Sequence, residues 1–351
     1  MKCLNLEGHD PRWDEFVRTN PQGTFFHLLK WRDVIARNFG HMPFYLYAEE
    51  GDKFVGVLPL FLVKSILFGK SLVSLPLAVY GGIVAENEEA ERLLMHAVKE
   101  LAYELQVGYV ELRGNPYSDK TGLFPDQNQR LRIKESNLYV TFIQEIDSSD
   151  KANFSRIPRK QRRMIRQGQK YGLRSLITED GSSDFYRVYA ESVRNLGTPV
   201  YPRSYFRDLQ EIFEDQCRTL LVEHQGKVVA GVLTFLYKDQ LLPYYSGSLR
   251  EYLHLAPNDF MYWELMSFGA ANGYRIFDFG RSKKETGSFD FKRHWGFEPR
   301  SLPYLYYPVD GNAIPDTSSL NPKLQWAVKL WSRLPLWLTM ILGPRIVRHL
   351  P

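Results

Sequence analysis

Two short stretches, KFVGVL at residues 53–58 and VVAGVL at residues 228–233, repeat each other at an offset of 175 residues. A second pair, GYVEL at residues 108–112 and GYRIFD at residues 273–278, repeats at an offset of about 165. Around each pair the hydrophobic pattern predicts helices, then antiparallel strands, then one helix and a last strand. The chain is therefore predicted to contain two related α/β domains.

The predicted fold class is α/β, of the α+β kind, with two tandem domains that each hold a mixed, mostly antiparallel sheet flanked by helices. A chain of 351 residues exceeds the size at which a single core normally grows, which supports two domains. We expect the first domain at residues 1–146, the second at 147–311, and a basic amphipathic helical tail at 312–351.

The composition argues against several classes of protein. Cys3 and Cys217 lie far apart, without any CxxC pattern, so neither a disulfide framework nor a thiolate metal site is expected. The histidines show no HxxxH or HExxH spacing, and no metal is predicted. The N-terminal residues lack a secretory hydrophobic region, and no run of about 18 apolar residues would span a membrane. A cytoplasmic location is therefore expected.

The net charge of +5 is located in the tail. Residues 317–351 hold five cations and no acid, so the remaining chain has 45 − 5 = 40 cations against 40 acids. Tryptophan, leucine and isoleucine alternate with these cations, and prolines interrupt the pattern. Such a segment suits the interface of an anionic membrane, as a peripheral contact on the inner face of the cytoplasmic membrane. The alternative is a helix docked on the second domain. The tail cations are Lys323, Lys329, Arg333, Arg345 and Arg348.

The candidate site lies in RIFDFGRSKKETGSFDFKRHWGFEP, residues 275–299. A short apolar strand with one acid breaks at Gly280 into a loop of cations, and a second aromatic and basic run follows. A rigid scaffold that presents a cationic loop is typical of a binding site for an anionic ligand. The alternative is a solvated basic loop beside an aromatic core patch.

This order of elements resembles the GNAT acyltransferase fold, and two copies in tandem resemble the Fem-type aminoacyl transferases that build peptidoglycan cross-bridges. The matching residues are the basic helix RKQRRMIRQGQKYGL at 159–173, DFG at 278–280 and GSFDFKRHWG at 287–296. The likeness is closest to FemAB-related proteins of exosortase/PEP-CTERM systems in exopolysaccharide-producing bacteria. It implies acyl or aminoacyl transfer to an amine or hydroxyl of a cell-envelope or exopolysaccharide precursor, a lipid-linked or nucleotide-linked glycan.

The resemblance implies aminoacyl-tRNA or acyl-CoA as the donor substrate, with no bound cofactor. Members that use acyl-CoA grip its pyrophosphate with a glycine-rich turn before a long helix. Residues 246–263, SGSLREYLHLAPNDFMYW, lack these glycines, and GGIVAEN at 81–87 is not that pattern either. The basic helix at 159–170 is either a solvated face or a contact for RNA or a lipid-linked pyrophosphate. A non-catalytic GNAT-like binding protein in a polysaccharide or secretion assembly stays an alternative.

Acyl transfer to an amine needs a group that accepts the amine's proton and hydrogen-bond donors that stabilise the oxyanion. It also needs groups that bind the anionic end of the acyl donor. Strands 241–248 and 276–279 are expected to splay apart and leave backbone groups unpaired. Lys292, which matches the family's FK lysine, is predicted to stabilise an anionic intermediate or a phosphate. Asp278 is predicted to accept the proton, or else to pair with a cation. His294 is an alternative base.

Five further residues are predicted to bind substrate, although the two aromatic ones, Tyr245 and Trp295, suit the core as well. All are expected in the second copy, because the first continues into residues 115–117 without the FKRHWG element. The substrate-binding candidates are Arg281, Tyr245, Ser246, Lys284 and Trp295.

Overall fold

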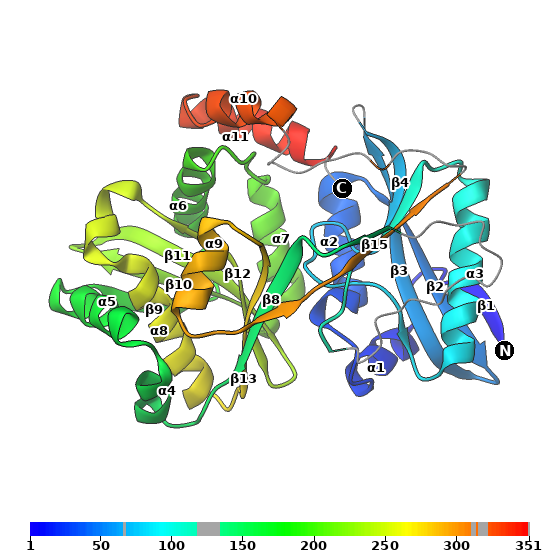
Figure 1. Ribbon diagram of the computed structural model, residues 1–351, viewed down its shortest axis with the longest axis horizontal. Coiled ribbons are helices and arrows are strands. Elements are labelled where there is room, and N and C mark those ends of the chain that lie inside the picture. The colour runs from blue at the N-terminus through cyan, green and yellow to red at the C-terminus, as the bar shows by residue number, and fades with distance from the viewer. Residues whose placement is uncertain (66–67, 118–133, 310–313, 315–321, 350–351) are drawn as a thin grey trace. The chain divides into compact units, whose positions relative to one another are not determined.

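The computed structural model describes residues 1–65, 68–117, 134–309, 314 and 322–349. The chain divides into two compact units. Unit 1 comprises Met1–Val140, Ser301–Thr317 and Arg348–Pro351, and unit 2 comprises Thr141–Arg300 and Ser318–Val347. Each unit is built on one twisted sheet with helices packed against it (Figure 1), which confirms the predicted fold class.

Unit 1 has a sheet of order β1-β2-β3-β4-β6-β15-β7, with β5 paired to β3. Its strands are β1 (Lys2–Asn5), β2 (Met42–Glu50), β3 (Lys53–Ser65), β4 (Gly69–Val73), β5 (Val84–Ala85), β6 (Tyr109–Leu112), β7 (Lys134–Ser136) and β15 (Tyr304–Pro308). Its helices are α1 (Pro11–Thr19), the short η1 (Phe25–His27), α2 (Leu29–Phe39) and α3 (Glu88–Glu104). Strands β4 and β6 run parallel, and the neighbouring pairs of the sheet are antiparallel.

Unit 2 has a sheet of order β14-β8-β13-β12-β11-β10-β9, in which β12 and β13 run parallel. Its strands are β8 (Tyr139–Glu145), β9 (Arg174–Thr178), β10 (Cys217–His224), β11 (Lys227–Tyr237), β12 (Gln240–Ser248), β13 (Ile276–Lys283) and β14 (Pro299–Ser301). Its helices are α4 (Asp150–Arg156), α5 (Arg159–Lys170), α6 (Ser182–Asn195), α7 (Arg203–Phe213), η2 (Glu214–Gln216), η3 (Arg250–Leu255), α8 (Pro257–Ala271), α9 (Gly287–His294), α10 (Pro322–Trp331) and α11 (Leu336–Val347).

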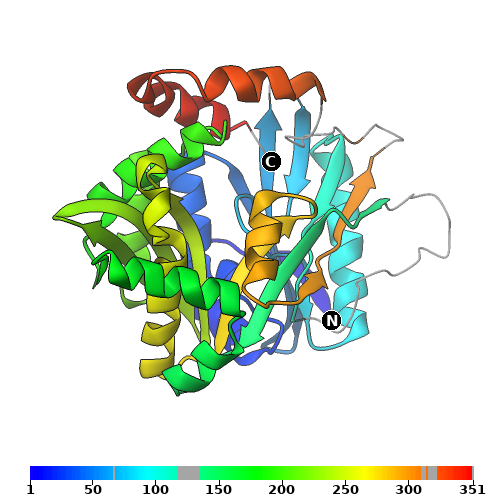
Figure 2. The ribbon, with the colours of Figure 1, turned by 60° about the vertical axis from the view of Figure 1, so that its left-hand side comes forward.

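The helices of unit 2 cover both faces of its sheet. Helix α6 packs on β11 and β12, with α7 beside it. Helix α8 packs on the other face, and α5 lies outside α8 (Figure 1 and Figure 2). Unit 1 repeats this plan, since α1 and α2 contact β3 and β2 while α3 precedes the last parallel strand, as α8 does in unit 2.

The two sheets have the same strand order, and each takes one strand from the other half of the chain. Strand β15 follows the strands of the second half yet pairs with β6 in unit 1. Strand β8 follows the strands of the first half yet lies beside β13 in the sheet of unit 2. The units therefore differ from the predicted boundaries at 146 and 311, because short terminal strands are exchanged. Residues 315–321 of the predicted tail lie outside the described residues.

The repeat is shifted by one residue in the structure. The β2–β3 ladder skips Val55, and the β10–β11 ladder skips Val229, an offset of 174 rather than 175. Because side chains alternate along a strand, a shift of one residue reverses the face. An added Cβ on Gly56 would lie 3.0 Å from an α3 leucine, whereas on Gly231 it would lie 3.1 Å from an α6 phenylalanine. The two strands are equivalent, but their matched glycines are not.

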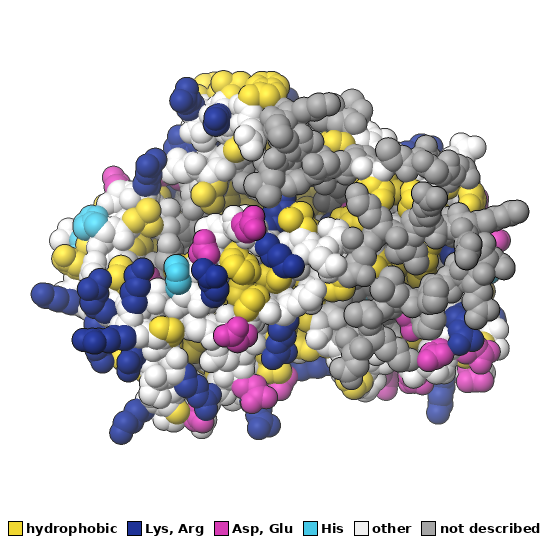
Figure 3. Space-filling model, viewed as in Figure 1, with side chains coloured by type: hydrophobic (Ala, Val, Ile, Leu, Met, Phe, Trp, Pro, Cys, Tyr) yellow, Lys and Arg dark blue, Asp and Glu magenta, His cyan; other side chains and the backbone are white. Residues whose placement is uncertain are grey.

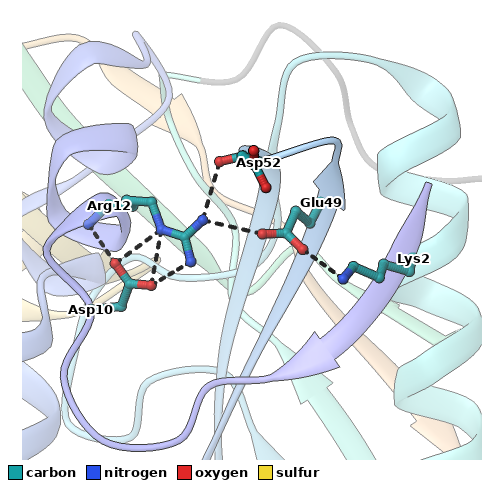
Figure 4. Close-up of polar contacts among 5 residues, drawn as sticks. All are labelled: Lys2, Asp10, Arg12, Glu49 and Asp52. Atoms are coloured by element: carbon teal, nitrogen blue, oxygen red, sulfur yellow. Dashed lines mark hydrogen bonds and ion pairs between the residues drawn. The ribbon is translucent and has the colours of Figure 1, made fainter.

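Polar contacts fix the start of α1 against the β2–β3 hairpin (Figure 4). The Asp10 carboxylate accepts the Arg12 N–H at 2.9 Å and caps the helix. The Arg12 guanidinium also donates to Asp10 at 2.7 Å, to Glu49 at 3.2 Å and to the Asp52 carbonyl at 3.1 Å. Lys2 contacts the same Glu49 at 3.0 Å. The two cations are exposed, whereas the Glu49 carboxylate that they share is buried, so the network orients the start of α1 against the hairpin.

The parallel strands β4 and β6 of unit 1 remain hydrogen-bonded to each other up to their C-terminal ends. After three paired residues, the Ser74 N–H donates to the Glu111 carbonyl at 2.8 Å. The Ser74 hydroxyl accepts the N–H groups of Gly82 at 3.1 Å and of Arg113 at 2.8 Å. The buried Arg113 guanidinium donates to the Glu111 carboxylate at 2.9 Å and to the Ala78 carbonyl. The loop after β4 therefore seals this end of the β4–β6 pair.

We expect Arg113→Met to lower the free energy of unfolding by about 3 to 5 kcal/mol, because it leaves the buried Glu111 carboxylate without its ion pair. The matched control is Arg92→Met, which removes an exposed ion pair with Glu88 and costs less than about 1 kcal/mol. Urea unfolding of both variants measures the difference. A loss for Arg113→Met no larger than that of the control would contradict the structural role of this pair.

Candidate active site

The equivalent parallel strands of unit 2 part early. Strands β12 and β13 pair at two positions, Gln240 with Ile276 and Leu241 with Phe277. In unit 1 a third pair, Val73 with Glu111, follows. In the described strands of unit 2, the residues at the same position, Leu242 and Asp278, are not paired with each other. The backbone groups of β12 beyond Leu241 therefore lose their β13 partners, as the sequence predicts for this strand pair.

A β-bulge in β12 lies at this point. Leu233 of β11 pairs with Tyr245 and Thr234 pairs with Pro243, so the ladder skips Tyr244. The bulge places two consecutive tyrosine rings on the α6–α7 face of the sheet: the Tyr244 ring lies 4.7 Å from Tyr245 and 5.2 Å from Phe235. Bulges of this kind often re-aim groups beside active sites. The position of the bulge at Tyr244 could not be predicted from the sequence, because nothing in a YYSGS run marks the residue that the ladder skips.

Tyr245 and Ser246, both predicted to bind substrate, point to opposite faces of β12. The Tyr245 hydroxyl lies 2.9 Å from that of Tyr205, and burial raises the pKa of both phenols well above 10. These phenols therefore stay neutral, and the two rings pack on the α6–α7 face of the sheet beside the bulge. The half-buried Ser246 hydroxyl accepts a hydrogen bond at 3.0 Å from Tyr262 of α8.

Lys292 of α9 closes over the end of β13. Its Nζ donates to the carbonyl oxygens of Phe279 at 2.6 Å, Gly280 at 3.0 Å and Arg281 at 3.1 Å. An ammonium has three donors, so each is used. Burial lowers the pKa of Lys292 to about 7, Asp278 opposes that change, and the Arg281 guanidinium adds to it. The structure thus brings Lys292, Asp278 and Arg281 together.

Asp278 is fully buried at the first position of β13 without a β12 partner. Its carboxylate accepts the Gly280 N–H at 2.8 Å and the Thr141 hydroxyl at 3.5 Å. Gly280 has φ +66, a left-handed conformation that suits glycine, so Asp278 holds an irregular residue inside the strand. The predicted break into a loop at Gly280 is wrong, because β13 continues to Lys283 and places Arg281 within the strand. The catalytic role of Asp278 stays a prediction.

Trp295 is buried in the core beside this site. Its indole N–H donates to the Asp259 carboxylate at 3.1 Å, which joins the end of α9 to α8. Burial raises the pKa of Asp259 to about 6, and the Trp295 hydrogen bond opposes the change. The side chain of Trp295 therefore has no donor left for a substrate. Lys284 and His294 are exposed, in the turn after β13 and at the end of α9.

Comparison with known protein families gives a match, and it covers this region. Residues 153–293 match the family described as "Acetyltransferase (GNAT) domain". This match covers about two fifths of the chain and lies within unit 2. No curated protein shows a significant match to the chain in sequence.

Solved structures show the same fold over both halves of the chain. FemX is 16% identical, with a TM-score of 0.69 over 93% of this chain and 100% of that chain. The C-terminal domain of an Agrobacterium fabrum protein assigned as a lysylphosphatidylglycerol synthetase is 13% identical, with a TM-score of 0.55 over 87% and 92%. A tandem GNAT protein from the clavulanic acid biosynthesis pathway is 13% identical, with a TM-score of 0.51 over 88% and 98%. The predicted tandem GNAT-like fold is thus confirmed.

The long helix α8 of unit 2 begins without the groups that bind a pyrophosphate. Its first residue, Pro257, has no N–H, and Ala256 before it is left-handed with φ +59. The first turn already contains the buried Asp259 carboxylate. A helix N-terminus favours anions through free N–H groups and its dipole, and both are reduced here. Among the described residues, no group of three or more His, Cys, Asp or Glu could hold a metal ion.

The predicted basic helix is α5 of unit 2, and it presents a row of exposed cations (Figure 3, left). Its inner face, with Ile165 and Gly168, is buried, and the Gly168 Cα packs closely on Phe260 of α8. Arg166 lies over the Phe154 ring at 5.2 Å. None of these cations forms a salt bridge within the described part of the chain. The exposed cations are Arg159, Lys160, Arg163, Arg166 and Lys170.

We expect the stability of the protein relative to a Lys292→Met variant to rise with pH. The pKa of Lys292 is about 7 when folded and about 10.5 when unfolded. Below pH 7 both states are charged, and the folded state bears the full cost of burying the ammonium. Between these values the unfolded state keeps a proton that the folded state has released, so unfolding becomes less favourable as the pH rises.

Urea unfolding between pH 6 and pH 10 measures this difference. The exposed Lys284→Met variant is the control and should follow the unmodified protein. A difference between the unmodified protein and Lys292→Met that stays constant over this range would contradict a buried ammonium.

Proposed function

We propose that the GNAT domain of unit 2 transfers an acyl or aminoacyl group to an amine, or less favourably to a hydroxyl. The observation that carries this proposal is the early end of the β12–β13 ladder, combined with the bulge at Tyr244. This combination frees backbone N–H groups of β12 to stabilise the oxyanion that forms during acyl transfer. The equivalent position in unit 1 is sealed by Ser74 and Arg113, so one half of the chain is proposed to be active.

In the proposed reaction the amine nitrogen attacks the donor's carbonyl carbon, and the ester or thioester bond of the donor breaks. Asp278 accepts the amine proton, which then passes to the leaving oxygen or sulfur. The Lys292 charge stabilises the oxyanion when its longest contact, to the Arg281 carbonyl at 3.1 Å, is exchanged for the substrate oxygen. The Arg281 guanidinium is proposed to bind the anionic end of a substrate.

Aminoacyl-tRNA is the donor that we favour over acyl-CoA. The start of α8 provides little for a pyrophosphate, because Pro257 lacks an N–H and Asp259 adds a carboxylate. The exposed cations of α5 suit the phosphate backbone of an RNA. Within this proposal the acceptor is a lipid-linked or nucleotide-linked precursor of the cell envelope or of an exopolysaccharide, as the Fem-type resemblance implies. A role beside an exosortase/PEP-CTERM system rests on that resemblance.

The transfer is tested with purified protein, a membrane extract, and either aminoacyl-tRNA or acyl-CoA, followed by mass analysis of the glycolipids. We expect a mass increase with aminoacyl-tRNA. Lys292→Ala and Asp278→Asn should each lower the rate about a hundredfold or more, whereas Arg92→Ala, at an exposed residue of unit 1, should leave it unchanged. Unchanged masses with both donors would instead support the alternative, a GNAT-like protein that binds the precursor without catalysis.

We also propose that α10 and α11 attach the protein to an anionic membrane surface. One side of this helix pair is docked within unit 2: the Trp331 N–H donates to the Thr198 carbonyl at 3.1 Å, and Gly343 packs on the backbone of Val200. The other side exposes large apolar side chains beside Lys329 and Arg333, and Figure 3 shows hydrophobic groups gathered at the top over these helices. The exposed apolar residues are Trp326, Leu330, Trp337, Ile341 and Ile346.

Docking on the second domain and exposure of an apolar face are thus combined in one element, although the sequence analysis treats them as alternatives. In the described part of the chain, the structure has no helix that is long and apolar enough to cross a membrane. Trp326 and Trp337 are 66% and 64% exposed, which is unusual for tryptophan unless a partner covers it. An interfacial position at headgroup depth suits both indoles.

Replacing Trp326 and Trp337 together with serine should lower binding to vesicles of phosphatidylcholine and phosphatidylglycerol about tenfold or more, because each indole loses its burial in the interface. Co-flotation of protein with vesicles measures this binding. Leu253→Ser is the control, since Leu253 is also an exposed apolar residue of unit 2, on η3. Undiminished flotation of the double variant would contradict the proposed surface.

A further inference from the structure

Unit 1 contains a small cavity of about 230 Å³ at the junction of α2 and β2. Phe39 ends α2, and Gly40 turns the chain into β2 with φ +67. The buried Phe39 and Leu62 line the cavity together with Met42, which is 53% exposed. One side of the cavity is therefore apolar and reaches the surface through a flexible methionine.

The other side of the cavity is cationic. Lys64 extends from β3, and Arg348 and His349 follow the last helix of the chain. The His349 Nδ1 lies 3.3 Å from the Lys64 carbonyl, which fixes the C-terminal segment against β3. No acidic residue lines the cavity, and neither Lys64 nor Arg348 forms a salt bridge with another described residue.

The buried His41 ring also lines the cavity, close to its cations. The ring stacks on Phe39, with centroids 6.1 Å apart at an interplanar angle of 14°. Burial, together with the smaller effect of the Arg348 and His349 charges, lowers the pKa of His41 to about 4. The cations thus act within the cavity without a compensating acid, which favours an anionic occupant.

We infer that this cavity binds a phosphate group carried by an amphiphile. Arg348 and Lys64 suit phosphate oxygens, since a guanidinium offers paired donors and an ammonium a point charge. Phe39, Leu62 and Met42 suit the carbon chain attached to the phosphate. The volume accommodates the phosphate and the first carbons of the chain, with the remainder extending past Met42.

The shared chemistry of the candidate ligands is phosphate, which a lipid headgroup or free phosphate could supply. The apolar wall favours the lipid, because inorganic phosphate would leave Leu62 and Phe39 without an apolar partner. The site uses none of the residues proposed for acyl transfer or for the tail surface. Its failure would therefore leave those proposals untouched.

Isothermal titration calorimetry with three probes tests the site: dihexanoyl phosphatidic acid below its micelle concentration, inorganic phosphate, and dihexanoyl phosphatidylcholine. We expect saturable 1:1 binding of the phosphatidic acid. Lys64→Ala and Arg348→Ala should each weaken it about tenfold, as for loss of one charge-assisted hydrogen bond. Arg345→Ala is the matched control, an exposed tail cation that does not line the cavity, and should bind as the unmodified protein does.

Three results would overturn the inference. Inorganic phosphate that binds as tightly as the phosphatidic acid would exclude the amphiphile. Phosphatidylcholine that binds equally well would exclude recognition of the phosphate charge. Unchanged binding by the Lys64→Ala/Arg348→Ala double variant would place the ligand elsewhere. Because both side chains are exposed, the variants should unfold at the same urea midpoint as the unmodified protein, which separates loss of binding from loss of folding.

Discussion

The ammonium of Lys292 bound to three successive carbonyls is the contact on which the candidate site depends. A strand that leaves its neighbour exposes backbone groups that must find other partners, or the ladder closes again. Lys292 provides those partners from α9, while Trp295 and Asp259 hold the same helix against α8. The divergence of β12 and β13 is thus maintained from one side of β13, by contacts that do not involve the β12 bulge.

The two units show what the same scaffold does with and without such a clamp. In unit 1 the acid of the last parallel strand, Glu111, is paired with Arg113 from the same strand, and Ser74 joins the strand ends. In unit 2 the corresponding acid, Asp278, accepts hydrogen bonds from Gly280 and Thr141, and the cation near it, Lys292, comes from a separate helix and binds backbone carbonyls. A local ion pair makes a closed, structural element. A cation brought from a separate helix does not join the ends of the two strands.

The sequence predicted the order of elements, because long apolar strands leave clear patterns. That the second half carries the site, an inference from the FKRHWG run, stays a prediction. The sequence did not predict the exchange of β8 and β15, since a strand of five to seven residues carries no local signal for the sheet that it joins. The bulge at Tyr244 and the shift between Gly56 and Gly231 depend on register, which tertiary packing decides. Trp295 and Lys292 were placed in the right neighbourhood, but the partners of their polar atoms depend on packing that a motif does not contain.

The exchanged strands have a consequence for how the chain is made. Strand β6 acquires its neighbour β15 only after residue 308 has been synthesised, although every other long strand of that sheet is complete by residue 112. During translation the first sheet therefore waits with an unpaired edge while the whole second half emerges from the ribosome. An unpaired edge is prone to intermolecular association. Neither half of the chain completes a sheet by itself, and an arrest in synthesis before residue 299 would leave both sheets without a strand.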